Sequence, residues 1–345
     1  MNRQAASLVA LVALPAAAQG HPPPDYGFNF ITIGDTGNGA YDREDLRGFT
    51  VGRGSVDYEY RIAQTEVTSV QFAEFLNAWD SSGGSPGALG AFFWGGFHDG
   101  TQWTVVPGKE LNPIGGFSWR EAAVFTNWLH NGKPTNNLDG FLDGAYDTST
   151  FTLTRDPVFA YNDQTTRSPG AKYWIPSFDE WIKAAHYDPN KDGHGDGGWW
   201  LYSDSSDTQP VPGMPGTGET SAGVDIDLGD AFDIPLMSYP ETQSPWGLLD
   251  VSGGGTEWTE EWHAVNGPDE RTHRNWQGNA AGIRIWNPNN SLFSADLAWS
   301  FGADWPDLGF SYLSLRIASA IPAPGTGVWL TCSLVFFVQR RRRYE

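Results

Sequence analysis

Residues 246–258 read WGLLDVSGGGTEW, and this stretch decides the fold. Three consecutive glycines, Gly253–Gly255, lie there between Asp250 and Glu257. Glycine adopts backbone conformations that other residues avoid, so such a run allows the main chain to bend closely around a neighbouring group. The stretch therefore predicts a tightly folded loop beside two carboxylates and two tryptophans, and the rest of the sequence must explain what that loop surrounds.

The segment before residue 85 predicts two strands and one helix. From Phe28 the sequence FNFITIG alternates apolar and polar residues, as a half-buried strand does, and a second strand is expected over 57–64. A helix is expected to begin at Thr68 or Ser69 and to stop before Gly83. Its predicted apolar stripe consists of Val70, Phe72, Phe75, Leu76 and Trp79.

Two further helices each begin with the S-x-x-E spacing of a capping box. The first box is Ser118 with Glu121, and the second is Ser177 with Glu180. The adjacent carboxylates at 179–180 and 260–261 are interpreted as solvated charge. The apolar residues that the two helices are expected to bury are Ala122, Phe125, Trp128 and Leu129, and Phe178, Trp181, Ala184 and Ala185.

These blocks, in this order, resemble the formylglycine-generating enzyme family, also called the sulfatase-modifying factor domain. The blocks are RIAQTEVTSVQFAEFLNA, NPIGGFSWREAAVFTNWL, YWIPSFDEWIKAAHYD, SPWGLLDVSGGGTEWTEEW and GFSYLSLRIAS. The fourth is similar to the family's Tyr-Gly-Leu-x-Asp-Met-x-Gly-Asn-Val-x-Glu-Trp. The resemblance implies an α+β fold, a variant of the C-type lectin-like fold with few helices, short antiparallel strands and much irregular loop.

A calcium site in the quoted stretch is the first functional implication of the resemblance. In the family this stretch wraps a calcium ion, which implies Asp250 and Glu257 as side-chain ligands and Gly253 and Gly255 as donors of main-chain carbonyls. Calcium takes roughly 6 to 8 oxygen ligands, so the backbone must fold around it. This chain has Gly254 where the family has Asn. A tight loop whose carboxylates only cap main-chain amides is the alternative.

A second, weaker candidate for a cation site is DPNKDGHGDGG, residues 188–198. Position 12 of an EF-hand pattern is Trp199 here, so the usual bidentate glutamate is missing. A variable glycine-rich surface loop is the alternative. The residues that match EF-hand ligand positions are Asp188, Asn190, Asp192 and Asp196.

The cysteine content bears on catalysis. Catalytic members of the family oxidise a substrate cysteine with a copper ion bound by two cysteines, and soft Cu(I) selects such thiolates. The only cysteine among the 345 residues is Cys332, in the apolar C-terminal segment. Copper is therefore not expected, and the chain is interpreted as non-catalytic. The alternative is a metal-dependent oxidoreductase of the same type with a cysteine-free site, drawing on His263, His273, Asp296 and Asp304.

The region after residue 262 is the candidate ligand surface. Lectin-related scaffolds bind carbohydrate or protein through their loops, and aromatic faces stack on sugar rings. Ordinary burial of these tryptophans is the alternative, and Trp246, Trp258 and Trp262 are expected in the core. The candidates for the ligand surface are Trp276, Trp286, Trp299, Trp305, His263 and His273.

The first residues of the chain predict export. Residues 1–18 combine a basic Arg3, an apolar run over 8–14 and small residues at 16–18, which is typical of a secretory signal peptide. A linker over 19–27 and a single sulfatase-modifying-factor-like domain over 28–320 follow.

The tail, residues 321–345, resembles the PEP-CTERM sorting signal, which an exosortase recognises and removes. It has Pro322-Ala323-Pro324, an apolar segment over 327–338 and four arginines over 340–343, with Ala where the signal usually has Glu. Twelve residues of helix span about 18 Å, short of the roughly 30 Å hydrocarbon core. A plain weak membrane anchor is the alternative, and membrane contact is expected only through this tail.

The charge of the chain restricts its partners. With 41 acidic and 21 basic residues the net charge is −20, so nucleic acid is not an expected partner. The sequence therefore predicts an exported, calcium-stabilised, non-catalytic binding module at the cell surface or outside the cell. The ligand is expected to be carbohydrate or protein. A structural component of the matrix or cell surface is a further alternative.

Overall fold

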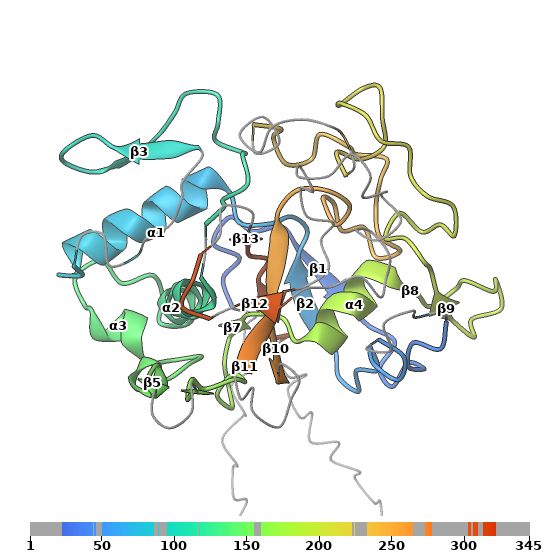
Figure 1. Cartoon of the computed structure of the whole chain (residues 1–345), viewed down its shortest axis with the longest axis horizontal. Coiled ribbons are helices and arrows are strands. Elements are labelled where there is room, and N and C mark those ends of the chain that lie inside the picture. Colours follow the sequence, from blue (N-terminus) through green and yellow to red (C-terminus); the bar gives the residue numbers. More distant parts are fainter. Residues whose placement is uncertain are drawn as a thin grey trace, which may run out of the picture. The chain divides into compact units, whose positions relative to one another are not determined.

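A four-stranded antiparallel sheet joins the beginning and the end of the folded chain (Figure 1). Its order is β1-β2-β14-β7, and Ala318 of β14 pairs with Ile62 of β2. The last strand therefore lies beside the segment that leads into the first helix. The strands are β1 (Phe30–Ile33), β2 (Tyr60–Ala63), β14 (Ala318–Ser319) and β7 (Tyr173–Trp174).

A second four-stranded sheet follows the glycine run. Its order is β12-β11-β10-β13, in which β10 pairs with β13 in parallel and the other pairs are antiparallel. The long strand β10 begins directly after the glycines. The strands are β10 (Thr256–Ala264), β11 (His273–Gln277), β12 (Ala303–Asp304) and β13 (Leu313–Ser314).

This computed structural model describes most of the chain between residues 23 and 321, which form one compact unit. The described residues are 23–43, 45, 50–85, 89, 95–116, 118–154, 160–222, 224, 233–264, 273–277, 303–304, 306–309 and 313–321. The predicted signal peptide lies outside them, and so does the predicted sorting tail after its first residue, Ile321. Within this described part, no helix has the length and apolar character that a membrane crossing requires.

The helices confirm the predicted capping boxes. They are α1 (Ser69–Ser81), α2 (Trp119–His130), the short α3 (Asp139–Leu142) and α4 (Phe178–His186), with a 3-10 turn at Thr148–Thr150. Ser118 and Ser177 cap α2 and α4 as predicted, and Thr68 caps α1 through a third box with Gln71. The helix α3 has no counterpart in the prediction.

One residue of the predicted apolar stripe lies on the opposite face of α1. The side chains of Phe72, Phe75, Leu76 and Trp79 are buried, but Val70 is 45% exposed. Residues two apart on a helix differ by about 200° around its axis, so Val70 cannot share the face of Phe72. The expectation that Val70 is buried was wrong for this reason.

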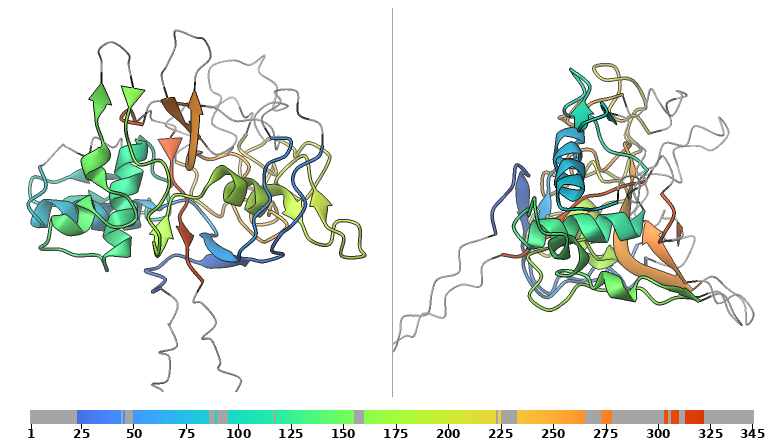
Figure 2. Two further views of the ribbon diagram at one scale, coloured as in Figure 1. Left: turned by 90° about the horizontal axis from the view of Figure 1, so that it is seen from below. Right: turned by 90° about the vertical axis from the view of Figure 1, so that its left-hand side faces the viewer.

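The core is rich in aromatic rings that lie between the helices and the sheets. In Figures 1 and 2, α1, α2 and α3 lie on one side of the central strands and α4 on the other. Phe75 contacts Phe125 and Trp128 at ring-centroid distances of 5.0 and 5.5 Å. As predicted, Trp258 is fully buried, and Trp246 packs against the core.

Among the described residues, three two-stranded hairpins extend from this scaffold. The hairpins are β3 (Gly96–His98) with β4 (Trp103–Val105), β5 (Leu153–Thr154) with β6 (Ala160–Tyr161), and β8 (Tyr187–Asp188) with β9 (Gly198–Trp199).

Candidate functional site

The glycine loop, residues 250–257, is held tightly between three other segments. Gly253 and Gly254 have φ angles of +79° and +72°, in the region that favours glycine. A Cβ atom on Gly253 would lie 2.4 Å from the Ser221 hydroxyl oxygen, and one on Gly255 would lie 2.5 Å from Cβ of Ser314. The glycines are therefore required by backbone conformation and by close approach.

Glu257, one of the predicted calcium ligands, forms a fully buried ion pair with Arg316. Nη2 of Arg316 donates to Oε1 of Glu257 at 2.8 Å, and the indole N–H of Trp181 donates to Oε2 at 2.6 Å. Arg316 also donates to the main-chain carbonyls of Ala63 and Leu249, each at 3.0 Å. The pair thus connects the loop to β2 and to the segment between β13 and β14.

Glu66, just before α1, lies against the same loop and is fully buried. Its Oε1 accepts a hydrogen bond from the Gly255 amide at 2.9 Å, whereas its Oε2 has no hydrogen-bond partner among the residues that the structure describes. Burial, and after it the charge of Glu257, raise the pKa of Glu66 well above its usual value. On β13, the buried hydroxyl oxygen of Ser314 also lacks a hydrogen-bond partner within the described part of the chain.

Asp250, at the start of the loop, lines a small cavity. Its Oδ2 accepts a hydrogen bond from the Met237 amide at 2.8 Å, and burial raises its pKa to about 6. The cavity measures about 20 Å³, which is room for about one water molecule. Its lining includes the oxygen-bearing residues Asp250, Ser252, Ser221 and Tyr239.

The predicted calcium ligands therefore differ in what their side chains already contact. Among the residues that the structure describes, no three His, Cys, Asp or Glu side chains form a group that could hold a metal ion. A cation on this loop would need main-chain oxygens for most of its ligands. The calcium set Asp250, Gly253, Gly255 and Glu257 stays a prediction. Sequence reasoning did not find Glu66, Ser314 or Arg316, because only the sheet topology brings them to the loop.

The second candidate loop, 188–198, uses its carboxylates on its own backbone. Oδ1 of Asp188 accepts the Asn190 amide at 2.8 Å, and Oδ1 of Asp192 accepts the amides of His194, Gly195 and Asp196 at 2.9 to 3.2 Å. The Asp192 pKa is lowered, first by the bond from the His194 amide. These contacts are those of a self-capped surface loop, and ion binding at Asp188, Asn190, Asp192 and Asp196 stays a prediction.

The second sheet brings together part of the predicted ligand surface. His263 lies in β10, His273 and Trp276 in β11, and Asp304 in β12. His273 pairs in register with Ala264, so the two histidines stand one register position apart on neighbouring strands. The other candidates, Trp286, Asp296, Trp299 and Trp305, lie outside the described residues.

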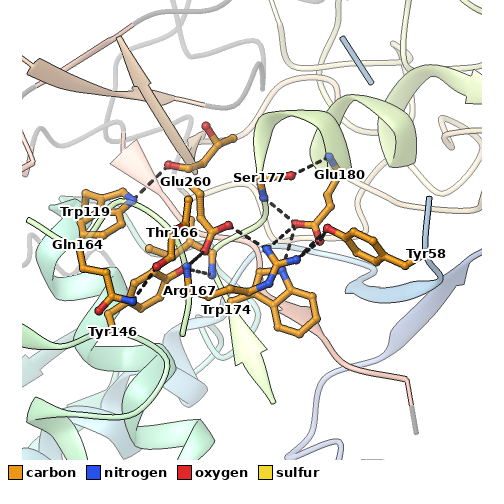
Figure 3. Close-up of polar contacts among 12 residues, drawn as sticks. Tyr58, Trp119, Tyr146, Gln164, Thr166, Arg167, Trp174, Ser177, Glu180 and Glu260 are labelled. Carbon is orange, nitrogen blue, oxygen red and sulfur yellow. Dashed lines mark hydrogen bonds and ion pairs between the residues drawn. The ribbon is translucent and has the colours of Figure 1, made fainter. Parts of the chain in front are cut away.

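A second ion-pair cluster, in which the carboxylates are buried and the guanidinium is partly exposed, surrounds Arg167 (Figure 3). The guanidinium donates to Oε1 of Glu180 at 2.9 Å and to Oε2 of Glu260 at 2.8 Å. It lies 4.2 Å from the ring centroid of Trp174. Beside it is an open cavity of about 360 Å³, lined by Tyr58, Arg167 and Trp174 among others.

The interpretation of the adjacent carboxylates as solvated charge was wrong for Glu180 and Glu260. Both are buried, whereas their neighbours Asp179 and Glu261 are partly exposed and share Arg53. Successive side chains of a strand point to opposite faces, and successive helical residues differ by about 100°, so one member of each pair turns inward. Burial raises the pKa of Glu260 to about 7.

Comparison with known proteins identifies the family. The model of the Sulfatase-modifying factor enzyme 1-like domain matches residues 29–308. The chain belongs to this family. The predicted α+β fold class, with four helices and short strands among the described residues, is thereby confirmed for a sulfatase-modifying factor domain.

Several solved structures are similar to this sulfatase-modifying factor domain. CarF is 18% identical, with 86% of this chain and 99% of that chain covered and a TM-score of 0.49. PvdO from Pseudomonas aeruginosa is 13% identical, with 87% and 97% covered and a TM-score of 0.46. Treponema denticola variable protein 1 is 14% identical, with 85% and 95% covered and a TM-score of 0.41. No curated protein matches the chain.

Proposed function

We propose that this chain is an exported, non-catalytic sulfatase-modifying factor domain that serves as a binding module at the cell surface or outside the cell. The observation that carries the proposal is that the only cysteine, Cys332, lies beyond the compact unit of residues 23–321. A copper site of two thiolates requires two cysteines, so the residues present do not fit copper. No reaction through copper is derived for this chain.

Calcium is the cation that the proposal assigns to the glycine loop. Three carboxylates lie around Arg316: Glu66 and Glu257 are buried, and Asp250 is half-buried. Burial, and after it the charge of Glu257, favour the protonated form of Glu66, and burial raises the pKa of Asp250 to about 6. One guanidinium cannot balance all three carboxylates once they ionise, and an uncompensated buried charge is costly. A hard divalent cation with oxygen ligands would offset the excess. The family-implied set of Asp250, Gly253, Gly255 and Glu257 is the starting point for that site.

Export and ligand class rest on the sequence at the two ends and in the C-terminal third. The signal-peptide pattern over 1–18 and the PEP-CTERM-like tail over 321–345 support export with processing by an exosortase. Tryptophans 276, 286, 299 and 305 supply flat apolar faces, which suit carbohydrate rings or a protein surface. Membrane contact is assigned only to the tail.

Metal content and thermal stability test the proposal. The full-length chain, purified without chelator, is expected to contain about one equivalent of calcium and no copper or iron by mass spectrometry. EDTA should lower the melting temperature and added calcium should restore it, since a ligand at about 100 times its Kd contributes about 2.7 kcal/mol.

The same preparation tests the non-catalytic assignment. No oxidation of a cysteine-containing peptide is expected, with or without added copper. Stoichiometric copper or iron, or peptide oxidation, would overturn the assignment and favour a cysteine-free oxidoreductase. Self-association without binding to any glycan or protein ligand would favour a structural surface component instead.

A further inference from the structure

Two buried oxygen atoms that have no hydrogen-bond partner among the described residues meet the glycine loop from opposite parts of the sequence. They are Oε2 of Glu66, which follows β2, and Oγ of Ser314 on β13. A Cβ atom on Gly254 would lie 3.1 Å from Oε2 of Glu66, and one on Gly255 would lie 3.3 Å from Oγ of Ser314. Oε2 of Glu66 therefore lies close to Gly254, and Oγ of Ser314 lies close to Gly255, the next residue of the loop.

Such orphaned oxygens require an explanation. A buried acceptor without a partner costs about 1–3 kcal/mol, and more when it is charged, so native proteins contain few of them. The Glu66 carboxylate is held in place from the other side, because its Oε1 accepts the Gly255 amide. The free oxygen is thus fixed at the loop instead of being free to turn to solvent.

Glu257 is poorly placed to serve as the side-chain ligand of a cation on this loop. Its carboxylate accepts hydrogen bonds from Nε and Nη2 of Arg316 and from the Trp181 indole. These contacts occupy most of the acceptor positions of a carboxylate. A cation bound there would have to compete with a guanidinium that is itself fully buried.

We propose that Glu66 and Ser314, instead of Glu257, supply the side-chain oxygens of the calcium site on the glycine loop. The proposal rests on the calcium binding stated under the proposed function and assigns its ligands. Main-chain carbonyls of the loop and water would complete the coordination of the ion. Glu257 is a positioning residue that fixes the loop through Arg316.

Calcium titration of matched variants tests the assignment. Glu66→Gln keeps an acceptor for the Gly255 amide but removes the charge, and Ser314→Ala removes only the hydroxyl. Glu59→Gln makes the same change at an exposed glutamate and is the control. Calorimetric titration of the full-length chain with calcium alone should show a Kd at least tenfold weaker for Glu66→Gln, severalfold weaker for Ser314→Ala, and unchanged for Glu59→Gln.

A stability measurement separates a ligand from a merely structural glutamate. In calcium-free buffer Glu66→Gln should melt no lower than the wild type, because it removes a buried charge and keeps the hydrogen bond. With calcium it should melt lower than the wild type, because it gains less from the ion. If Glu66→Gln does not fold, the Ser314→Ala titration decides, with terbium luminescence excited through the buried tryptophans as a second measure of ion affinity.

The outcomes distinguish this inference from the proposed function. Wild-type affinity in both Glu66→Gln and Ser314→Ala would overturn the ligand assignment and leave the calcium site intact. A wild-type chain that binds no calcium would overturn the calcium part of the proposed function together with the assignment. In that case Glu66 is a protonated acid, and Glu66→Gln should then be indifferent to calcium and at least as stable as the wild type.

Discussion

The clusters around Arg316 and Arg167 contain the same chemical groups but differ in one respect. Each places one guanidinium among more than one buried carboxylate. Around Arg167, both oxygens of Glu180 and both oxygens of Glu260 accept hydrogen bonds, with Tyr58 and Tyr146 among the donors. Around Arg316, one oxygen of Glu66 accepts no hydrogen bond from any residue that the structure describes.

The difference teaches where to look for a ligand. Excess negative charge is common to both clusters, so charge alone does not mark a cation site. Hydrogen-bond donors from the protein complete the Arg167 cluster, which therefore has no need of an ion. Among the described residues, the Arg316 cluster lacks one hydrogen-bond donor to Glu66. The free oxygen of Glu66 lies beside a loop whose glycines allow close approach.

Removal of each arginine gives the largest expected effect on this comparison. Arg316→Leu leaves Glu257 buried without its cation and should cost about 3–5 kcal/mol of unfolding free energy, the usual result of removing one partner of a buried pair. Arg167→Leu should cost less, about 2–3 kcal/mol, because Glu260, whose pKa is already about 7, can take up a proton instead. Urea denaturation of both variants measures the difference.

Calcium sharpens the same experiment. Saturating calcium should recover part of the stability of Arg316→Leu, because the ion replaces some of the lost positive charge. It should leave Arg167→Leu unchanged. Equal losses with no calcium response in either variant would show that the two clusters are both closed, structural ion pairs.

The pH dependence of Glu260 is the next largest effect. Burial raises its pKa in the folded state from 4.5 to about 7, so the folded chain binds this proton more tightly than the unfolded chain does. Its contribution is therefore most favourable below pH 4.5 and is lost as the pH rises towards 7. A change in this pKa from 4.5 to about 7 corresponds to at most about 3.4 kcal/mol.

Comparison with Glu260→Gln isolates that contribution from the other titrating groups. The unfolding free energy of the wild type minus that of the variant should fall between pH 4.5 and 7 and then become constant. A difference that rises with pH would mean that the ion pair with Arg167 outweighs burial, and that the Glu260 pKa is lowered in the folded chain.

Local features of the fold could be predicted from the sequence, and long-range ones could not. Each capping box, at Ser118 and at Ser177, spans four residues, so the spacing of its residues is enough to predict its geometry. Asp250 was found as part of a local motif. Glu66 reaches the loop only because β2, the strand before it, pairs with β14. Its partner Gly255 is 189 residues away in the sequence, and no hydrophobic periodicity indicates such a contact. Conversely, the motif could not show that Glu257 is engaged by Arg316.

The smallest effects come from one alanine in each cluster's loop. Gly170, in the loop that includes Arg167, has a φ of +83° and open space where a Cβ would lie. Gly170→Ala should therefore cost only the conformational penalty, about 1 kcal/mol. Gly253→Ala adds to the same penalty a contact of 2.4 Å with the Ser221 hydroxyl, so its loss of stability should be larger.

Calcium affinity should change in one of these two variants and stay unchanged in the other. Gly253→Ala must push the loop away from Ser221, which moves the neighbouring main chain that the ion would contact, so its Kd for calcium should weaken severalfold. Gly170→Ala should bind calcium as the wild type does, because its loop serves a cluster whose oxygens are already satisfied. If both variants lose stability but neither changes calcium affinity, the ion does not bind on the glycine loop, and the free oxygen of Glu66 requires a proton instead of a cation.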